Sequence, residues 1–235
     1  MSRWAKESKA RRHRSDHGHG VDSAPAVARK SAASQPDPVR SDSMSYFLTT
    51  ERLGFRCWHA RDESLAIDLW CNPQVTALIG GPWTREVALE RLAREIELQN
   101  QYRMQYWPIF LRAEGSLRAE GSLFADGRYA GCAGLRPYEA DHAIYEMGVH
   151  LLPEFWGQGI AREASQAIIA HGFGPLGVAE IVAGHHPHNA ASGRLLRKLG
   201  FTYTGDKLYT PTGLMHPMYQ LRREQAILSS GSGSV

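Results

Sequence analysis

Residues 152–161 read Leu-Pro-Glu-Phe-Trp-Gly-Gln-Gly-Ile-Ala, and this stretch decides the fold. The residues before it, 143–152, have the composition of a strand, and those after it, 162–171, have the apolar spacing of a helix. Gly157 and Gly159 therefore fall where a strand turns into a helix, and glycine permits a tight turn because it has no Cβ. The first turn of a helix directs unpaired N–H groups outward and favours negative charge. The segment therefore predicts a binding site for a phosphate-bearing ligand.

Two common phosphate-binding motifs are excluded at this turn. A Walker loop needs a lysine directly after its last glycine, and Ile160 follows Gly159. A dinucleotide fingerprint needs a third glycine or alanine at the position that Arg162 occupies. The glycine pair alone is also compatible with a plain tight turn.

A second motif follows at residues 179–201. A strand pattern at 179–183 leads into His-His-Pro-His-Asn-Ala-Ala-Ser at 185–192, and a helix pattern then ends in Leu-Gly-Phe at 199–201. Asn189 is a favourable residue before the start of a helix, and Gly200 is favourable just after its end.

Together, the two motifs resemble those of the GNAT superfamily of acetyl-CoA-dependent N-acetyltransferases, in the branch of the ribosomal-protein-alanine N-acetyltransferases. The family signature Gln/Arg-x-x-Gly-x-Gly/Ala corresponds here to Trp-Gly-Gln-Gly-Ile-Ala at 156–161, in which Trp156 departs from the usual Gln or Arg. The resemblance spans residues 49–222. It implies an α/β fold of the α+β type, in which a mixed, mostly antiparallel sheet of six to seven strands has helices on both faces. Two central strands of this sheet would splay apart around CoA.

The resemblance also implies which residues bind the cosubstrate acetyl-CoA. Leu151 and Leu152 would exchange main-chain hydrogen bonds with its pantetheine arm. The expected cofactor-binding residues are Leu151, Leu152, Gly157, Gln158, Gly159, Ile160, Ala161 and Asn189.

Acetyl transfer to an amine requires a neutral nitrogen, and a nearby base can supply it. Glu146 is the first candidate, because it lies on the predicted strand before the turn and on the same face as His150. A structural glutamate is the alternative. Many GNAT enzymes have a tyrosine at the position of Leu196 to protonate the leaving thiolate, so Ser192 or water would assist here.

The acceptor is expected to be a primary amine, and a protein N-terminus is the leading candidate. A small amine such as an aminoglycoside, a polyamine or an amino-acid derivative is the alternative, as is a non-catalytic acyl-CoA-binding or RNA-associated accessory protein. A homodimer is left open. No metal site is expected, because His185, His186 and His188 have no Cys, Asp or Glu beside them; we expect a substrate contact or a surface loop there.

Composition places the chain among ordinary globular proteins, with 235 residues, 43% hydrophobic and 22% charged. The sequence contains no run of 18 apolar residues, so no membrane span is expected. Three scattered cysteines favour a cytoplasmic location. Residues 1–43 hold nine Lys/Arg and five Asp/Glu, a net charge of +4, and the remainder carries −1. We expect 1–43 to be a disordered basic leader, 44–225 the acetyltransferase domain and 226–235 a flexible tail. The leader's Arg11-Arg12-His13-Arg14 run has the composition of a nucleic-acid contact, but an inert solvated tail is the favoured interpretation.

Apolar periodicity predicts the other elements of the domain. Strands are expected at 53–59, 105–111, 128–135, 179–183, 202–204 and 215–221, and helices at 62–71, 84–101, 162–171 and 189–199. The hexapeptide Arg-Ala-Glu-Gly-Ser-Leu occurs at 112–117 and again at 118–123, which predicts a lengthened hairpin loop.

Overall fold

The computed structural model describes residues 45–112, 127–138 and 144–225, which all fall within one compact unit. The leader, the tail and nearly all of the duplicated hexapeptide lie outside these residues. The strands are β1 (Leu48–Thr49), β2 (Leu53–Phe55), β3 (Tyr106–Leu111), β4 (Arg128–Pro137), β5 (Ile144–Leu151), β6 (Glu180–Gly184), β7 (Thr202–Tyr209) and β8 (Leu214–Arg222). The helices are α1 (Glu63–Trp70), α2 (Pro73–Thr76), α3 (Arg85–Tyr102), α4 (Ile160–Phe173) and α5 (Ala190–Lys198).

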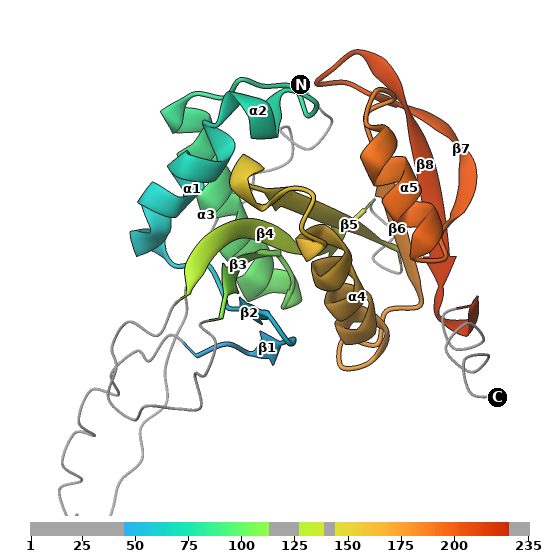
Figure 1. Ribbon diagram of the computed structural model, residues 1–235, viewed down its shortest axis with the longest axis horizontal. Helices are drawn as coiled ribbons and strands as arrows, with labels where there is room; N and C mark the ends of the chain where they lie inside the picture. Colours follow the sequence, from blue (N-terminus) through green and yellow to red (C-terminus); the bar gives the residue numbers. More distant parts are fainter. Residues whose placement is uncertain (1–44, 113–126, 139–143, 226–235) are drawn as a thin grey trace, which may run out of the picture. The chain divides into compact units, whose positions relative to one another are not determined.

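The strands form one sheet in the order β1-β2-β3-β4-β5-β6-β8-β7 (Figure 1). Among the described strands, only β5 and β6 pair in parallel, so the mixed, mostly antiparallel sheet that the sequence predicts is confirmed. The described part of the sheet has eight strands rather than six to seven. The additional strand is β1, whose two residues are too few to show a periodic pattern.

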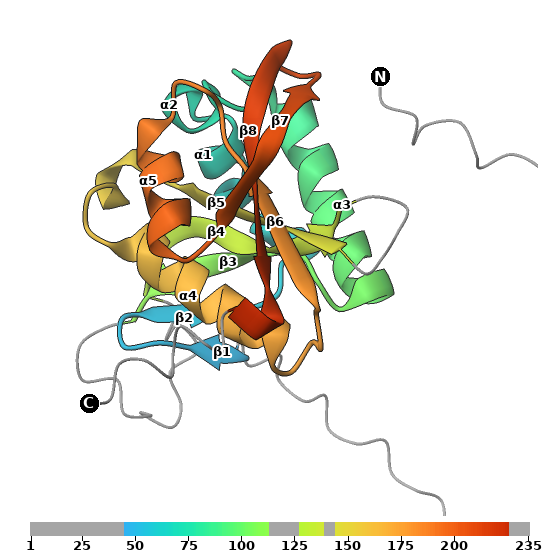
Figure 2. The same cartoon turned by 90° about the vertical axis from the view of Figure 1, so that its right-hand side faces the viewer.

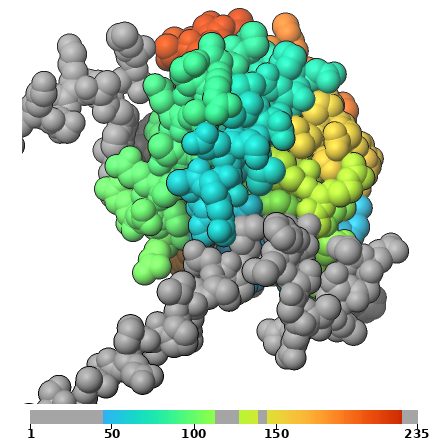
Figure 3. Space-filling view, turned by 90° about the vertical axis from the view of Figure 1, so that its left-hand side faces the viewer, coloured from blue at the N-terminus to red at the C-terminus, as the bar shows by residue number. Residues whose placement is uncertain are grey.

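Helices cover both faces of the sheet, as expected. On one face, α1 and α3 pack over a cluster that includes Trp70, Leu92 and Tyr106. On the other face, α4 and α5 pack over a larger cluster to which β5 contributes Met147 and Leu151. Figure 2 shows the sheet between α3 on one side and α4 and α5 on the other, and Figure 3 shows α1 and α3 side by side at the surface. None of the described helices is long and apolar enough to cross a lipid bilayer.

The parallel strands β5 and β6 separate part of the way along their length. Their register pairs only Ile144 with Glu180, Tyr145 with Ile181, and Glu146 with Val182, although β5 continues to Leu151 and β6 to Gly184. The two strands run in the same direction, so their diverging ends lie at the same edge of the sheet. Helices α4 and α5 both begin beyond this edge, which is where open α/β sheets bind ligands.

Candidate active site

The glycine turn after β5 has the backbone geometry that the sequence predicts. Gly157 has φ of 74° and Gly159 has φ of 79°, values that an L side chain rarely adopts. A Cβ at Gly157 would have no neighbour within 4 Å, and one at Gly159 would meet only Arg52 Nη2 at 3.5 Å. The backbone conformation therefore requires these glycines, and the space over them is open.

The N–H groups of residues 157–161 have no backbone acceptor within the described part of the chain. The first backbone hydrogen bond of α4 runs from Glu163 N to Gly159 O at 3.1 Å, so the earlier amides of the helix have no intrahelical acceptor. Gly159 occupies the N-cap position without a side-chain cap. Open space and amides without a backbone acceptor at the positive end of a helix fit a diphosphate.

The turn is held by the segment between β1 and β2, a contact that the sequence did not reveal. Arg52 donates from Nη1 to Gln158 O at 3.0 Å and from Nε to Glu163 Oε2 at 2.6 Å. Thr50 donates to the other oxygen of Glu163. Although partial burial opposes it, these hydrogen bonds lower the pKa of Glu163 and keep it ionised beside Arg52. An open pocket of about 380 Å³ lies here, lined by Thr50, Glu51, Arg52, Gly159, Arg162, Glu163 and Gln166.

The hydrogen-bond register of β5 determines which of its amides face β6. Leu152 N donates to Ala130 O at 2.9 Å and Tyr138 N donates to Ile144 O at 3.0 Å, so even-numbered residues of β5 bond to β4. The odd-numbered residues, including Leu151, therefore direct their N–H and C=O groups toward the side from which β6 diverges. This leaves the Leu151 N–H available to a ligand there, and its contact with the cofactor stays a prediction. The N–H of Leu152 is already used, and its carbonyl accepts from Phe155 N at 3.0 Å.

Trp156, the departure from the family signature, turns back onto the end of β5. Its indole Nε1 donates to Leu151 O at 2.8 Å, while the residue remains 49% exposed. The indole thus occupies the carbonyl of Leu151 and fixes the start of the turn relative to the strand.

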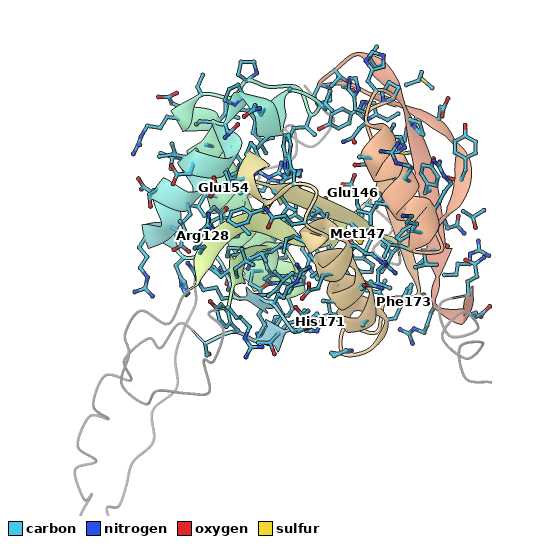
Figure 4. All side chains as sticks on the ribbon, in the orientation of Figure 1. Arg128, Glu146, Met147, Glu154, His171 and Phe173 are labelled. Atoms are coloured by element: carbon cyan, nitrogen blue, oxygen red, sulfur yellow. The ribbon has the colours of Figure 1, made fainter. Side chains whose placement is uncertain are left out.

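Glu146 is the last β5 residue that pairs with β6, so it lies where the two strands begin to separate (Figure 4). Its side chain accepts a hydrogen bond from Tyr106 on the α1–α3 face of the sheet, whereas its neighbour Met147 packs on the α4 face. Burial raises the pKa of Glu146, and the charge of Arg91 and the Tyr106 hydrogen bond offset part of this rise. A carboxyl group with a raised pKa is a stronger base when ionised.

His150 lies on the same face as Glu146, as strand alternation predicts. Trp70 Nε1 donates to His150 Nδ1 at 3.3 Å, and the Tyr106 ring lies 5.8 Å from the imidazole in an edge-on arrangement. Burial and the Arg91 charge lower the pKa of His150 to about 3, so it is neutral and a weak base at pH 7. Tyr106 lies between Glu146 and His150 because Gly148 leaves room: a Cβ there would come within 2.3 Å of the ring.

A network of charged side chains lies beneath Tyr106. Glu95 is fully buried; it accepts from Arg91 Nε at 2.9 Å and Tyr106 N at 2.8 Å, and also from Arg136 Nη2. The guanidinium carbon of Arg136 lies 3.6 Å from the centroid of the Tyr106 ring. Arg136 is also the backbone neighbour of Glu146 in the register of β4 and β5. The network connects α3, β3, β4 and β5 to Glu146, and the sequence pattern of α3 alone gave no indication of it.

Asn189 and Ser192 lie at the start of α5, beyond the end of β6. Asn189 Oδ1 accepts from Ser192 N at 3.1 Å, so the predicted N-cap is confirmed. Ser192 is half-buried. The structure thus places the glycine turn and Asn189 at the starts of the two helices that follow the diverging strands, and Glu146 at the point of divergence.

Of the three histidines before α5, His186 is buried, His185 is partly buried and His188 is exposed. His186 is 9% exposed, accepts from His188 N at 3.1 Å and lies 5.4 Å from the ring of His216. His185 Nδ1 lies 2.8 Å from His186 O, and its ring stacks on Tyr219. Within the described ranges, no group of three or more His, Cys, Asp or Glu side chains is arranged to hold a metal ion.

Comparison with known proteins agrees with this geometry. The family model of the acetyltransferase (GNAT) domain matches residues 52–202. The chain is 28% identical over 160 residues to the uncharacterized N-acetyltransferase YoaA of Bacillus subtilis (strain 168), which covers 67% of this chain and 84% of that protein.

Solved structures share the fold. A GNAT-family acetyltransferase from Bacillus anthracis superposes with a TM-score of 0.61 at 21% identity, covering 75% of this chain and 98% of that one. RimL, a ribosomal L7/L12 alpha-N-protein acetyltransferase in complex with coenzyme A, gives a TM-score of 0.61 at 18% identity, covering 76% and 98%. The glycine turn, the diverging strands and the family match agree that this chain belongs to the GNAT acetyltransferase family and is an acyltransferase.

Proposed function

We propose that this acyltransferase moves an acetyl group from acetyl-CoA to a primary amine by direct attack while both substrates are bound. The observation that carries the proposal is the position of Glu146. It lies where β5 and β6 separate, on the face of β5 opposite α4 and its glycine turn. A base and a cofactor that approach from opposite faces can act on two substrates at once, so no covalent enzyme intermediate is needed.

The chain offers acetyl-CoA two sets of backbone groups. The N–H groups of the turn at Gly157, Gln158, Gly159, Ile160 and Ala161 would hold the diphosphate. The free Leu151 N–H and Asn189 would hold the pantetheine arm, whereas both backbone groups of Leu152 already have partners. When bound, acetyl-CoA supplies an activated thioester carbon to the nucleophile.

Glu146 would take a proton from the ammonium group of the acceptor, directly or through a water molecule, so that the neutral amine can attack. From reference pKa values, about a tenth of an α-amine is neutral at pH 7, against roughly one in 2,500 for a lysine amine. A single carboxylate base therefore has a much smaller free-energy cost of deprotonation to overcome with an α-amine than with a lysine amine. Ser192 would donate a hydrogen bond to the leaving thiolate, and water is the alternative donor.

A protein N-terminus is the acceptor that this chemistry favours. RimL, the ribosomal L7/L12 alpha-N-protein acetyltransferase that shares this fold at 18% identity, acts on an acceptor of this class. A domain at 44–225 that works on a peptide needs no contribution from the basic leader.

Thiol release from acetyl-CoA, measured with matched acceptors, tests this proposal. Peptides with free N-terminal alanine or serine are expected to turn over, and the same peptides with an acetylated N-terminus and one internal lysine are not. Polyamines and aminoglycosides form the small-molecule arm. Turnover with small amines and none with any peptide would contradict the protein acceptor, and no turnover with any amine would contradict acetyl transfer to amines.

A further inference from the structure

The guanidinium group of Arg91 has hydrogen-bond donors that the protein does not use. Its Nε donates to Glu95, but no residue in the described parts of the chain accepts from Nη1 or Nη2. These two nitrogens are not sealed off from solvent either, since the side chain remains 17% exposed and neither atom is a buried, unpartnered group. A guanidinium that points two donors toward solvent can bind a carboxylate through two parallel hydrogen bonds.

Aromatic rings fix the position of this guanidinium. Its carbon lies 5.4 Å from the ring centroid of Trp70, 5.7 Å from that of Trp83 and 5.6 Å from that of Tyr106. Glu95 holds Nε from the remaining side. The Nη atoms are thus presented in one orientation, which reduces the entropy lost when a ligand binds.

Tyr106 joins Arg91 to the proposed base. The Arg91 guanidinium lies over the Tyr106 ring, 5.6 Å from its centroid, and the Tyr106 hydroxyl donates to Glu146, so an amine at Glu146 and an anion at Arg91 would both lie beside this ring. Burial raises the pKa of Tyr209 at the end of β7, and the charges of Glu146 and Arg91 also act on this hydroxyl.

The charge balance also favours an anion here. Arg91 and Arg136 both donate to Glu95, and the charge of Arg91 also acts on Glu146, so these four side chains carry no net charge while Glu146 is ionised. When Glu146 takes the proton from the ammonium, the network is left with one excess positive charge. A carboxylate on the acceptor would offset this charge, because acetylation removes the acceptor's own positive charge at the same step.

We propose that Arg91 binds a carboxylate of the amine acceptor, so that the enzyme prefers amines that carry a carboxylate close to the reactive nitrogen. The inference rests on the proposed function, since it concerns the acceptor of that reaction. The carboxylate has two possible sources: an acidic side chain near a peptide N-terminus, or the carboxylate of a free amino acid.

Thiol release by the full chain with paired acceptors tests the inference. The peptide arm compares C-terminally amidated peptides that differ only by Glu or Gln at the second position. The other arm compares an amino acid with its carboxamide. In at least one arm the wild type is expected to prefer the acidic member, and R91Q is expected to lower the ratio of the two kcat/KM values roughly 10- to 100-fold. The ratio does not depend on the fraction of folded enzyme, and differences in amine pKa between the two acceptors cancel between variants.

The matched control is R94Q, which removes the same charge from an exposed position of the same helix and should leave the ratio unchanged. If R91Q does not fold, R91K keeps a charge beside Glu95 but lacks the two-nitrogen fork, and it is expected to lower the ratio as well. A wild-type enzyme that turns over both members equally in both arms would overturn the carboxylate contact and leave the proposed function intact. Equal losses in R91Q and R94Q, or an unchanged ratio in R91K, would also overturn it. No turnover with any amine would overturn both.

Discussion

At Glu146, burial and neighbouring charge act on one carboxyl group in opposite directions. Burial raises its pKa, while Arg91 and the Tyr106 hydroxyl oppose the rise. The carboxylate therefore forms only above the ordinary range of a glutamate, and turnover should rise with pH through this raised pKa. The role of Glu146 as the base stays a prediction, which the variants Glu146→Gln and Tyr106→Phe test.

Replacing Glu146 by Gln is expected to lower kcat about 10²- to 10⁴-fold and to leave the Kd for CoA unchanged, because the base is lost and the glycine turn is untouched. Stability should not fall. A group whose pKa is raised by folding gives stability below its unfolded pKa and loses it as pH rises through the folded pKa, so glutamine avoids this loss at pH 7. Chemical unfolding at pH 4 and pH 7, with kcat measured in parallel, checks both statements. A normal kcat would remove Glu146 as the base.

Tyr106→Phe tests the hydrogen bond alone. The variant removes a bond that lowers the pKa of Glu146, so the acidic limb of the kcat profile should move to higher pH. The same limb should be absent in the Glu146→Gln variant. A profile that is identical to the wild type would mean that the hydroxyl does not act on this ionisation.

At the scale of elements, alanine substitutions can distinguish the glycine turn before α4, which is proposed to bind CoA, from a tight turn that only reverses the chain. Gly159 and Gly177 have similar positive φ values, 79° and 68°, and a Cβ at either would meet no atom closer than 3.5 Å. Alanine at either position should therefore cost about 1–2 kcal/mol of folding free energy. Only Gly159→Ala should also weaken CoA binding, by at least about 10-fold, or about 1.4 kcal/mol. Thermal unfolding and calorimetry measure the two effects, and equal CoA affinity in both variants would contradict the role of the turn.

Elements with clear apolar periodicity or capping residues could be predicted from the sequence, because these signals are local. Helix α3 begins after Thr84, whose hydroxyl accepts from Val87 N at 3.4 Å as the cap pattern indicates. Helix α2 and strand β1 were missed, since four and two residues carry too little pattern. Strand β7 proved longer than predicted because nearly all its residues are exposed, so no alternation marks it.

The candidate site was predictable only where it is local. The turn at 156–161 and the Asn189 cap follow from consecutive residues. By contrast, Arg52 reaches Glu163 across 111 positions, and Arg136 reaches Glu95 across 41. No spacing rule connects residues so far apart, because the sheet brings them together only after it has formed.

At the scale of the whole molecule, the basic charge and the folded domain occupy different parts of the sequence. Residues 1–43 carry +4 and the remainder −1. We predict that a chain starting at Met44 keeps the Tm and the CoA Kd of the full chain, because Tyr46, which accepts a hydrogen bond from Gly127 N, is retained. Scanning calorimetry and a CoA titration of both chains check this. A large fall in the Tm, or a large rise in the Kd for CoA, would show that the leader contributes to the folded domain.

Titration calorimetry of the full chain with coenzyme A tests the central claim, that the backbone amides of residues 157–161 hold the diphosphate of this cofactor. The account predicts saturable heat with one molecule bound per chain, and a loss of that heat in Gly159→Glu, whose charge and bulk would occupy the turn. No heat with the wild type at millimolar coenzyme A, or unchanged affinity in the glutamate variant, would contradict it.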